Sequence, residues 1–457
     1  MSNNTQIQSR LFSVDITFIL ISALIYSLLV LPKGVLLNTY LIKLQLHQFF
    51  SVLIFSFLIF SSIIKGHFLF RKMFYGIYFI IYYLSLFLVN FSIEASNLVF
   101  QVFVLFVSGL IIGSYIKNIE RLIKLETVLF TVFVILSVVI IYEYFTQTKV
   151  FYNRSYYFES TDAFSINLGK ISFDFTTLKS SIGPFGSNLQ LAGPYLLLGF
   201  LIILRSESLL SRMIFVFLFS LSVIGIQSRA GIISMLFFYG IWFNYINFKE
   251  RIIAFFMILI AGICSFLYFG YSTVMASIFY FPIPLYLFFA LLVMTIIVGY
   301  FFIRFLFTKK LLLIALLSSL LVLFFLDFGD DDATSLDGRL FGFKLLFENL
   351  LHNPMGAGPG NYTLGLVDSF DVFSDQGSIL ILLIETGIIG IFLLTCFFFK
   401  VFSLGYSPKN ISGFYVLSLI GIIPYIIFTI SFDVWFLIVL YSVVALRLQS
   451  VKRNTSV

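Results

Sequence analysis

The chain has 457 residues, of which 60% are hydrophobic and 11% are charged, and its mean hydropathy is +1.08. A soluble domain is about 45–50% apolar and about 25% charged, so this composition excludes a soluble globular protein. The net charge of +7 does not require a nucleic-acid partner, because the basic residues follow a membrane-topology pattern.

Apolar runs long enough to cross a bilayer alternate with short breaks that carry charges, Gly or Pro. The first run is too long for a signal-peptide core and no small-residue cleavage site follows it, so it is expected to be a retained helix. The pattern predicts an all-α, polytopic integral membrane protein with about fourteen transmembrane helices (range about 12–14) in a single membrane domain over 1–457. The predicted spans are 11–31, 48–64, 73–91, 97–116, 125–145, 189–204, 213–227, 230–246, 252–270, 284–303, 311–327, 378–399, 412–430 and 432–446.

Lys and Arg are concentrated in every second break between these spans. If the N-terminus is inside, most of the 28 basic residues lie in short cytoplasmic segments, among them those around Lys72, Lys124, Arg251 and Lys409. This is the distribution that the positive-inside rule describes. The sequence therefore predicts a multi-pass protein with both termini in the cytoplasm, and no nucleic acid is needed to explain its charge.

Two external segments are longer than a tight turn, at residues 146–187 and 328–377. Loops of this length in a compact fold are usually functional or disordered. The first is rich in Tyr, Phe, Ser and Thr, and its Arg154 is expected to be solvated. In the second, a helix-spaced apolar pattern runs from Leu340 to Leu351, after the potential cap Ser335 and before Asn353 and Pro354. This pattern predicts an amphipathic helix on the membrane surface or on the bundle.

A glycine-rich stretch, Asn353-Pro-Met-Gly-Ala-Gly-Pro-Gly-Asn-Tyr362, follows that helix. It is neither a dinucleotide fingerprint nor a P-loop, because no strand precedes it and no Lys-Ser/Thr follows it. Gly356, Gly358 and Gly360 could let backbone N–H groups converge on an anion or approach a sugar closely. The alternative is a flexible hinge after a surface helix.

Charged residues within or beside the spans have competing explanations. Arg229 stands at the external junction of two helices, where it either snorkels to lipid headgroups or serves a wet, functional site. Arg339 stands two residues after Asp337, and one explanation for it is a local ion pair that contributes little energy. Glu143 is near a helix end, where hydration is easy. Glu385 is deep in its span and indicates either a hydrogen bond between helices or a function.

In chain order, Ser228-Arg229-Ala-Gly, Arg339 before an amphipathic helix, the stretch from Asn353 to Tyr362, and Asp375-Gln-Gly-Ser leading to Glu385-Thr-Gly resemble the family of O-antigen polymerases (Wzy-type) and O-antigen ligases. The resemblance covers roughly residues 190–400, and the topology extends it to nearly the whole chain. It implies an integral-membrane glycosyltransferase that acts at the outer face of the bacterial inner membrane. Such an enzyme moves a glycan from an undecaprenyl-diphosphate donor to an acceptor, and builds O-antigen, common antigen or capsule.

The resemblance also implies residue roles. Arg229 and Arg339 match the arginines that are taken to hold the donor diphosphate. Ligases of the family carry a His-Asn pair where this chain has Gln376-Gly377, and an amide cannot act as a base. This departure favours a polymerase and makes Asp375 the nearest candidate for the general base, although Asp375 could also simply cap a helix. The candidate substrate-binding residues are Arg154, Gly358, Gly360, Asn361, Tyr362 and Gln376.

No metal or other cofactor is implied, because the sequence holds no compact carboxylate cluster, and Asp330, Asp331 and Asp332 are expected to form a solvated loop face. The expected partners are the lipid-linked donor and acceptor, together with a chain-length regulator and a flippase. The alternative to a polymerase is an O-antigen ligase. A lipid-linked-oligosaccharide flippase or other transporter is a more distant alternative, because it would place its charged residues at the span centres. A passive scaffold would not need convergent Arg positions.

Overall fold

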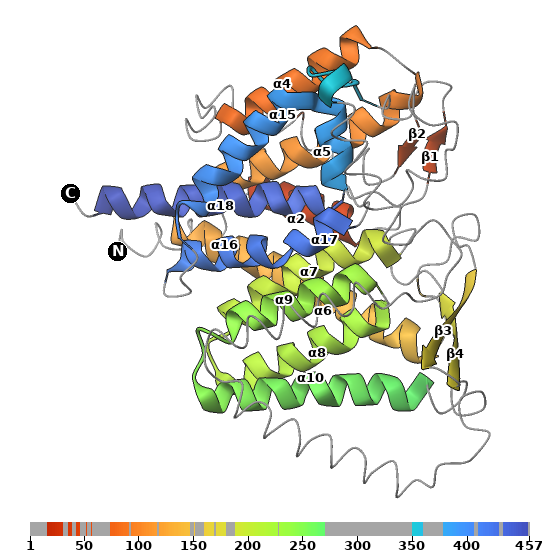
Figure 1. Cartoon of the computed structure of the whole chain (residues 1–457). Coiled ribbons are helices and arrows are strands. Elements are labelled where there is room, and N and C mark those ends of the chain that lie inside the picture. Colours follow the sequence, from red (N-terminus) through yellow and green to blue (C-terminus); the bar gives the residue numbers. More distant parts are fainter. Residues whose placement is uncertain are drawn as a thin grey trace, which may run out of the picture.

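The computed structural model describes the larger part of the chain as a bundle of helices (Figure 1). The described residues are 16–30, 35–38, 43–45, 52, 56, 74–90, 93–116, 118–146, 150, 160–168, 171–179, 188–226, 228–269, 350–359, 378–405, 410–428 and 433–455.

The helices are α2 (Ile16–Leu29), α4 (Phe74–Val89), α5 (Ile93–Tyr115), α6 (Ile119–Thr146), α7 (Asn188–Arg205), α8 (Leu209–Ile226), α9 (Arg229–Trp242), α10 (Phe248–Phe269), α15 (Ser378–Phe402), α16 (Ile411–Gly421), α17 (Ile423–Phe428) and α18 (Val434–Thr455). Among the described residues, three segments are long and apolar enough to cross a membrane, namely Ile119–Phe145, Leu209–Ile226 and Ile381–Phe402. The helical class and the membrane character that the composition predicts are therefore confirmed.

The structure describes only some of the predicted membrane spans. The predicted spans 284–303 and 311–327, and nearly all of 48–64, lie outside the described residues, so the total of about fourteen stays a prediction. The predicted span 412–430 is interrupted at Ile422, where α16 ends and α17 begins. Pro424 explains the break, because it has no N–H to donate to the carbonyl of Ile420 and its ring crowds that carbonyl.

Two antiparallel β-hairpins were not expected from the sequence (Figure 1). β1 (Val35–Asn38) pairs with β2 (Lys43–Gln45), and β3 (Ser160–Leu168) pairs with β4 (Ile171–Lys179). The longer hairpin lies within the first large external segment, and its register runs from Leu168 opposite Ile171 to Ser160 opposite Lys179.

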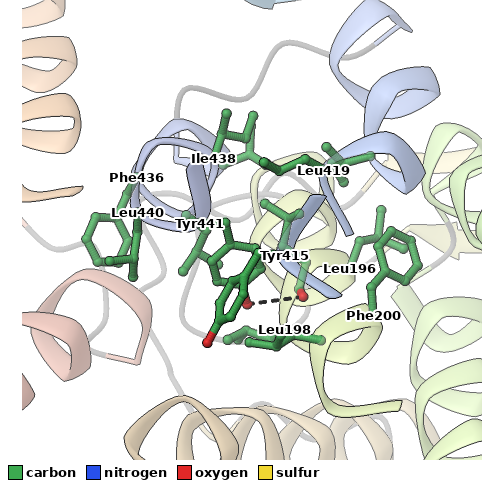
Figure 2. Close-up of a cluster of buried hydrophobic side chains, with 14 of the residues drawn as sticks. Leu196, Leu198, Phe200, Tyr415, Leu419, Phe436, Ile438, Leu440 and Tyr441 are labelled. Atoms are coloured by element: carbon green, nitrogen blue, oxygen red, sulfur yellow. Dashed lines mark hydrogen bonds between the residues drawn. The ribbon is translucent and has the colours of Figure 1, made fainter. Parts of the chain in front are cut away.

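The centre of the bundle is an aromatic and aliphatic core formed by α7, α16 and α18 (Figure 2). The rings of Tyr415 and Tyr441 meet edge to face, with 5.2 Å between their centroids. The hydroxyl of Tyr441 donates to the carbonyl of Leu197 at 3.2 Å, and the hydroxyls of Tyr195 and Ser137 are 2.7 Å apart. These buried tyrosines thus have hydrogen-bond partners inside the bundle, where neither water nor lipid would supply them.

Charged side chains tie together helix ends at one end of the bundle. Arg205, the last residue of α7, forms an ion pair with Glu126 of α6 at 2.8 Å. The other carboxylate oxygen of Glu126 accepts a hydrogen bond of 2.7 Å from the hydroxyl of Tyr415 on α16. This network fixes the end of α7 against the beginnings of α6 and α16.

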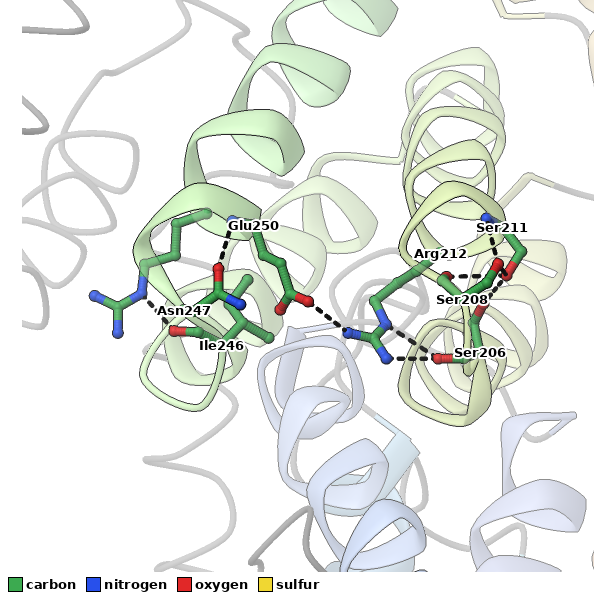
Figure 3. A network of polar contacts seen from close by, with 8 residues as sticks. Ser206, Ser208, Ser211, Arg212, Ile246, Asn247 and Glu250 are labelled. Atoms are coloured by element: carbon green, nitrogen blue, oxygen red, sulfur yellow. Dashed lines mark hydrogen bonds and ion pairs between the residues drawn. The ribbon is translucent and has the colours of Figure 1, made fainter.

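A second network closes the same end between α8 and α10 (Figure 3). Arg212 donates to the carbonyl of Ser206 at 2.6 Å and lies 3.5 Å from the carboxylate of Glu250. Arg251 of α10 donates to the carbonyl of Ile246 at 2.9 Å. This bond ties the start of α10 to the turn after α9. All of these cations belong to breaks that the sequence assigns to the cytoplasmic side. Their common position at one end of the bundle agrees with that assignment.

Candidate functional site at a broken helix

Helix α15 is interrupted at Gly387, before its middle. Gly387 has φ 59° and ψ −157°, a backbone conformation that is essentially confined to glycine. In a continuous helix the N–H of Ile388 would donate to the carbonyl of Ile384, and the carbonyl of Glu385 would also accept a bond from the next turn. The break releases these groups inside an apolar bundle, where an unpaired backbone group costs several kcal/mol.

Residues 353–359, the Gly-rich segment, supply the missing hydrogen bonds. The N–H of Ala357 donates to the carbonyl of Ile384 at 3.1 Å, and the N–H of Gly358 donates to the carbonyl of Glu385 at 3.0 Å. In return, the N–H of Ile388 donates to the carbonyl of Pro354 at 2.9 Å. We call this docked arrangement of the Gly-rich segment on the break of α15 the splice.

The splice requires glycine on both of its sides. Gly356 has φ 98°, and a Cβ atom there would lie 2.3 Å from the carbonyl oxygen of Glu385. A Cβ atom on Gly387 would lie 2.3 Å from the nitrogen of Gly356 and 2.5 Å from the carbonyl oxygen of Pro354. Real Cβ atoms essentially never approach this closely. These glycines therefore permit two backbones to touch, which is one of the established uses of glycine.

This geometry changes the interpretation of the glycine motif. The segment is held to α15 by backbone bonds, so the interpretation as a free hinge is replaced by that of a docked element. The N–H groups of Gly356, Ala357 and Gly358 donate to the carbonyls of Asn353, Ile384 and Glu385. These N–H groups thus form hydrogen bonds within the protein, and the predicted substrate-binding role of Gly358 stays a prediction.

Helix α4 forms the third side of the splice. The hydroxyl of Tyr82 donates to the carbonyl of Met355 at 2.5 Å, and the hydroxyl of its neighbour Tyr83 donates to Oε2 of Glu385 at 2.9 Å. Beyond them, a Cβ atom on Gly358 would lie 2.6 Å from Nδ2 of Asn90, so the segment lies directly against the end of α4.

Glu385 and Tyr83 are both fully buried, with no exposed surface. One of the two interpretations of Glu385 from the sequence, a hydrogen bond between helices, is thus confirmed. The sequence did not single out Tyr82, Tyr83 or Asn90. Tyrosine occurs 25 times in the chain, so no pattern distinguished these two from the rest.

The beginning of α9 explains part of a second motif. Ser228 is buried and caps the helix, because its hydroxyl accepts a hydrogen bond of 3.1 Å from the N–H of Gly231. A Cβ atom on Gly231 would stand 3.5 Å from the Cβ atom of Ala192, so α9 packs closely on α7. Arg229 is the first residue of α9, and its side chain lies outside the described part of the structure.

Glu143, which the sequence placed in an easily hydrated position, is instead buried, with 4% of its surface exposed. Its Oε1 accepts a hydrogen bond of 2.7 Å from the N–H of Val150. The adjacent Tyr144 packs on Gly225, where a Cβ atom would lie 3.2 Å from its ring. Because Gly225 precedes the junction of α8 and α9, the end of α6 lies next to the segment that carries Arg229.

The remaining predicted site residues lie outside the described residues, and their positions stay predictions. They are Arg154, Arg339, Gly360, Asn361, Tyr362, Asp375 and Gln376. Of the predicted amphipathic helix, only residues 350–352 are described, and they are helical. Within the part of the chain that the structure describes, no three His, Cys, Asp or Glu residues are grouped as metal ligands would be.

Comparisons of this chain with protein-family models, with curated proteins and with solved structures found no match.

Proposed function

We propose that this chain is a membrane glycosyltransferase that polymerises undecaprenyl-diphosphate-linked oligosaccharide repeat units at the periplasmic face of the bacterial inner membrane. The observation that carries the proposal is the splice. It joins the glycine-rich motif to the Glu385-Thr-Gly motif through backbone bonds, and these are two of the motifs on which the resemblance rests. Motifs that meet in space form one structural unit, and that unit leads directly to Gly360, Asn361 and Tyr362.

The position of Arg229 supports an anionic substrate. A cation at the first residue of a helix faces the positive end of the helix dipole, which is an unfavourable place for it. An anion bound there would be attracted by both the guanidinium group and the helix N-terminus. The planar guanidinium also matches phosphate oxygens in a two-pronged geometry and keeps its charge at any physiological pH.

The orientation of the bundle supports an outer-face reaction. The positive-inside rule assigns the end that carries Arg205, Arg212 and Arg251 to the cytoplasm. The first residue of α9 and the splice then belong to the outer half of the membrane, since α9 ends and α10 begins at the Arg-rich end. An undecaprenyl-diphosphate donor whose glycan is exposed to the periplasm would reach both.

The proposed reaction is a displacement at the anomeric carbon of the donor glycan. The acceptor hydroxyl forms the new C–O bond as the bond from the anomeric carbon to the lipid diphosphate breaks. The hydroxyl proton passes to Asp375 or to an oxygen of the departing diphosphate. Arg229 and Arg339 stabilise the negative charge that develops on the diphosphate, and the external loops orient the two glycans.

The proposal is tested by supplying the purified protein in lipid vesicles with the undecaprenyl-diphosphate-linked repeat unit of its own bacterium. We expect a ladder of longer lipid-linked glycans, and we expect deletion of the gene to leave single-repeat surface glycans. Uncapped lipid A core, with polymer retained on the carrier lipid, would instead identify a ligase. Unchanged surface glycans and no ladder would refute both assignments.

A further inference from the structure

The polar contacts on α4 and α15 have a geometry that the overall reaction does not explain. Tyr82 and Tyr83 are adjacent on α4, yet one hydroxyl bonds the Gly-rich segment at Met355 and the other bonds α15 at Glu385. The carbonyl of the same Glu385 accepts the N–H of Gly358. Glu385 is thus the point at which α4, α15 and the Gly-rich segment are joined.

We propose that Tyr83 and Glu385 are positioning residues of the polymerase. Their hydrogen bond holds the break of α15 in the conformation that receives the Gly-rich segment. It thereby holds in place part of the glycine-rich motif that the proposed function assigns to the donor glycan. This inference rests on the proposed function. Glu385 acts here as the hydrogen-bond acceptor of Tyr83.

The burial of the pair explains why one hydroxyl matters. Both side chains are fully buried, so no water replaces a lost partner. Loss of the Tyr83 hydroxyl or of the Glu385 side chain would remove this hydrogen bond between α4 and α15 at the residue whose carbonyl holds Gly358. The segment would then sample undocked positions, and only the docked fraction would bind donor, which raises the apparent dissociation constant.

The test compares Tyr83→Phe, Glu385→Ala and Glu385→Gln with the wild-type protein in vesicles. Gln retains a carbonyl oxygen that accepts from Tyr83, so Glu385→Gln should rescue what Glu385→Ala loses. We expect the KM for the lipid-linked repeat unit to rise about tenfold in Tyr83→Phe and Glu385→Ala, with a smaller change in kcat. Tyr78→Phe is the matched control, because Tyr78 is on the same helix and 52% exposed.

Amide hydrogen exchange of peptides covering residues 353–359 and 384–388 gives a second readout that needs no substrate. Exchange should accelerate in Tyr83→Phe and Glu385→Ala but not in Glu385→Gln or Tyr78→Phe. If Glu385→Ala fails to fold, Tyr83→Phe carries the test, because it removes only a hydroxyl group.

Three results would overturn the inference. An unchanged KM with lower apparent kcat would mean that the variants merely reduce the amount of active protein. A defect in Glu385→Gln as large as in Glu385→Ala would show that the carboxylate acts through its charge. Unchanged exchange in Tyr83→Phe would show that the pair does not hold the splice. If the wild-type protein forms no polymer at all, the proposed function fails, and the exchange data still decide whether this pair holds the splice.

Discussion

Single residues in this protein differ in whether backbone geometry or chemistry fixes their identity. At Gly356 and Gly387, positive φ angles and contacts below 3 Å exclude any side chain. Ser228 and Gly231 form the cap and the close packing at the start of α9. Arg229 lies between them and takes part in neither arrangement through its backbone. Its side chain lies outside the described part of the structure, so its binding role stays a prediction.

Replacing Gly387 with Ala should destabilise the protein. The backbone conformation alone costs about 1–3 kcal/mol for a residue with a side chain, and contact with the Gly-rich segment adds to this. The thermal midpoint of the purified protein in detergent measures the effect. Gly262→Ala in α10 is the matched control, because a Cβ atom there meets nothing within 4 Å and alanine favours helix. Equal midpoints for the two variants would contradict the close contact in the splice.

Replacing Arg229 with Lys keeps the charge but removes the planar pair of donors. If Arg229 binds the donor diphosphate, the change should cost about 1.5–3 kcal/mol, or about tenfold or more in kcat/KM. Arg121→Lys, at the Arg-rich end of the bundle, should have little effect on polymerisation. Polymer at the wild-type level from Arg229→Lys, with matched protein amounts, would instead favour an anchor that snorkels to headgroups.

Asp375→Asn separates chemistry from helix capping. Asn caps a helix about as well as Asp and has nearly the same shape, but it cannot accept the acceptor's proton. We expect expression to be unchanged and polymer to be lost. Gln376→His, which recreates the residue of the ligases, should not confer ligase activity, because we expect acceptor choice to depend on many side chains rather than on one. Full activity of Asp375→Asn would leave Asp375 as a cap alone.

At the scale of elements, hydrophobic runs predicted where helices lie better than where they end. The predicted span 125–145 corresponds to α6, which begins at Ile119 because its hydrogen bonds continue beyond the apolar run. An ion pair of 2.9 Å between Glu120 and Lys124, one turn apart, supports that first turn. Likewise, α18 continues through its basic end to Thr455. Helix ends follow backbone bonding and caps, which hydropathy does not record.

The hairpins and the splice were missed for different physical reasons. β3 and β4 are nine residues each, and apolar residues alternate with polar ones along much of both strands. The composition of the segment, which is rich in Tyr, Phe, Ser and Thr and predicted only a loop, does not report this alternation. The splice depends on backbone contacts between residues 354–358 and 384–388, which no local pattern reports. The sequence identified the motifs, including Glu385 and the glycines, but it could not show that they bond to each other.

At the scale of the whole molecule, the distribution of charge divides the bundle into two ends. The ion pairs of Arg205 and Arg212 lie at one end of the bundle. The splice is in the first half of α15, away from the basic residue Lys400 in the last turn of that helix. A cation at the end of a helix also interacts favourably with the helix dipole, as Arg205 does at the end of α7. The orientation in the membrane is therefore a prediction with a direct experimental test.

Single engineered cysteines at positions 121 and 335 should report this orientation. In intact cells, a membrane-impermeant thiol reagent should label position 335, in the second external segment, and leave position 121 unlabelled until the cells are permeabilised. The positive-inside rule gives this expectation. Both native cysteines, Cys264 and Cys396, should first be replaced by serine so that only the introduced thiol reacts. Labelling at 121 but not at 335 would reverse the topology, and the proposed outer-face reaction with it.

The splice also has a consequence for how the chain enters the membrane during synthesis. Before docking, α15 would present unpaired carbonyls of Ile384 and Glu385 to lipid, so it is a poorer inserting helix than its apolar residues suggest. Its partners, α4 and residues 353–359, both precede it in the chain. When α15 leaves the ribosome, the groups that complete its backbone bonding have already been made. The order of the elements along the chain thus allows α15 to be released into the bilayer directly against α4, with its broken backbone already covered.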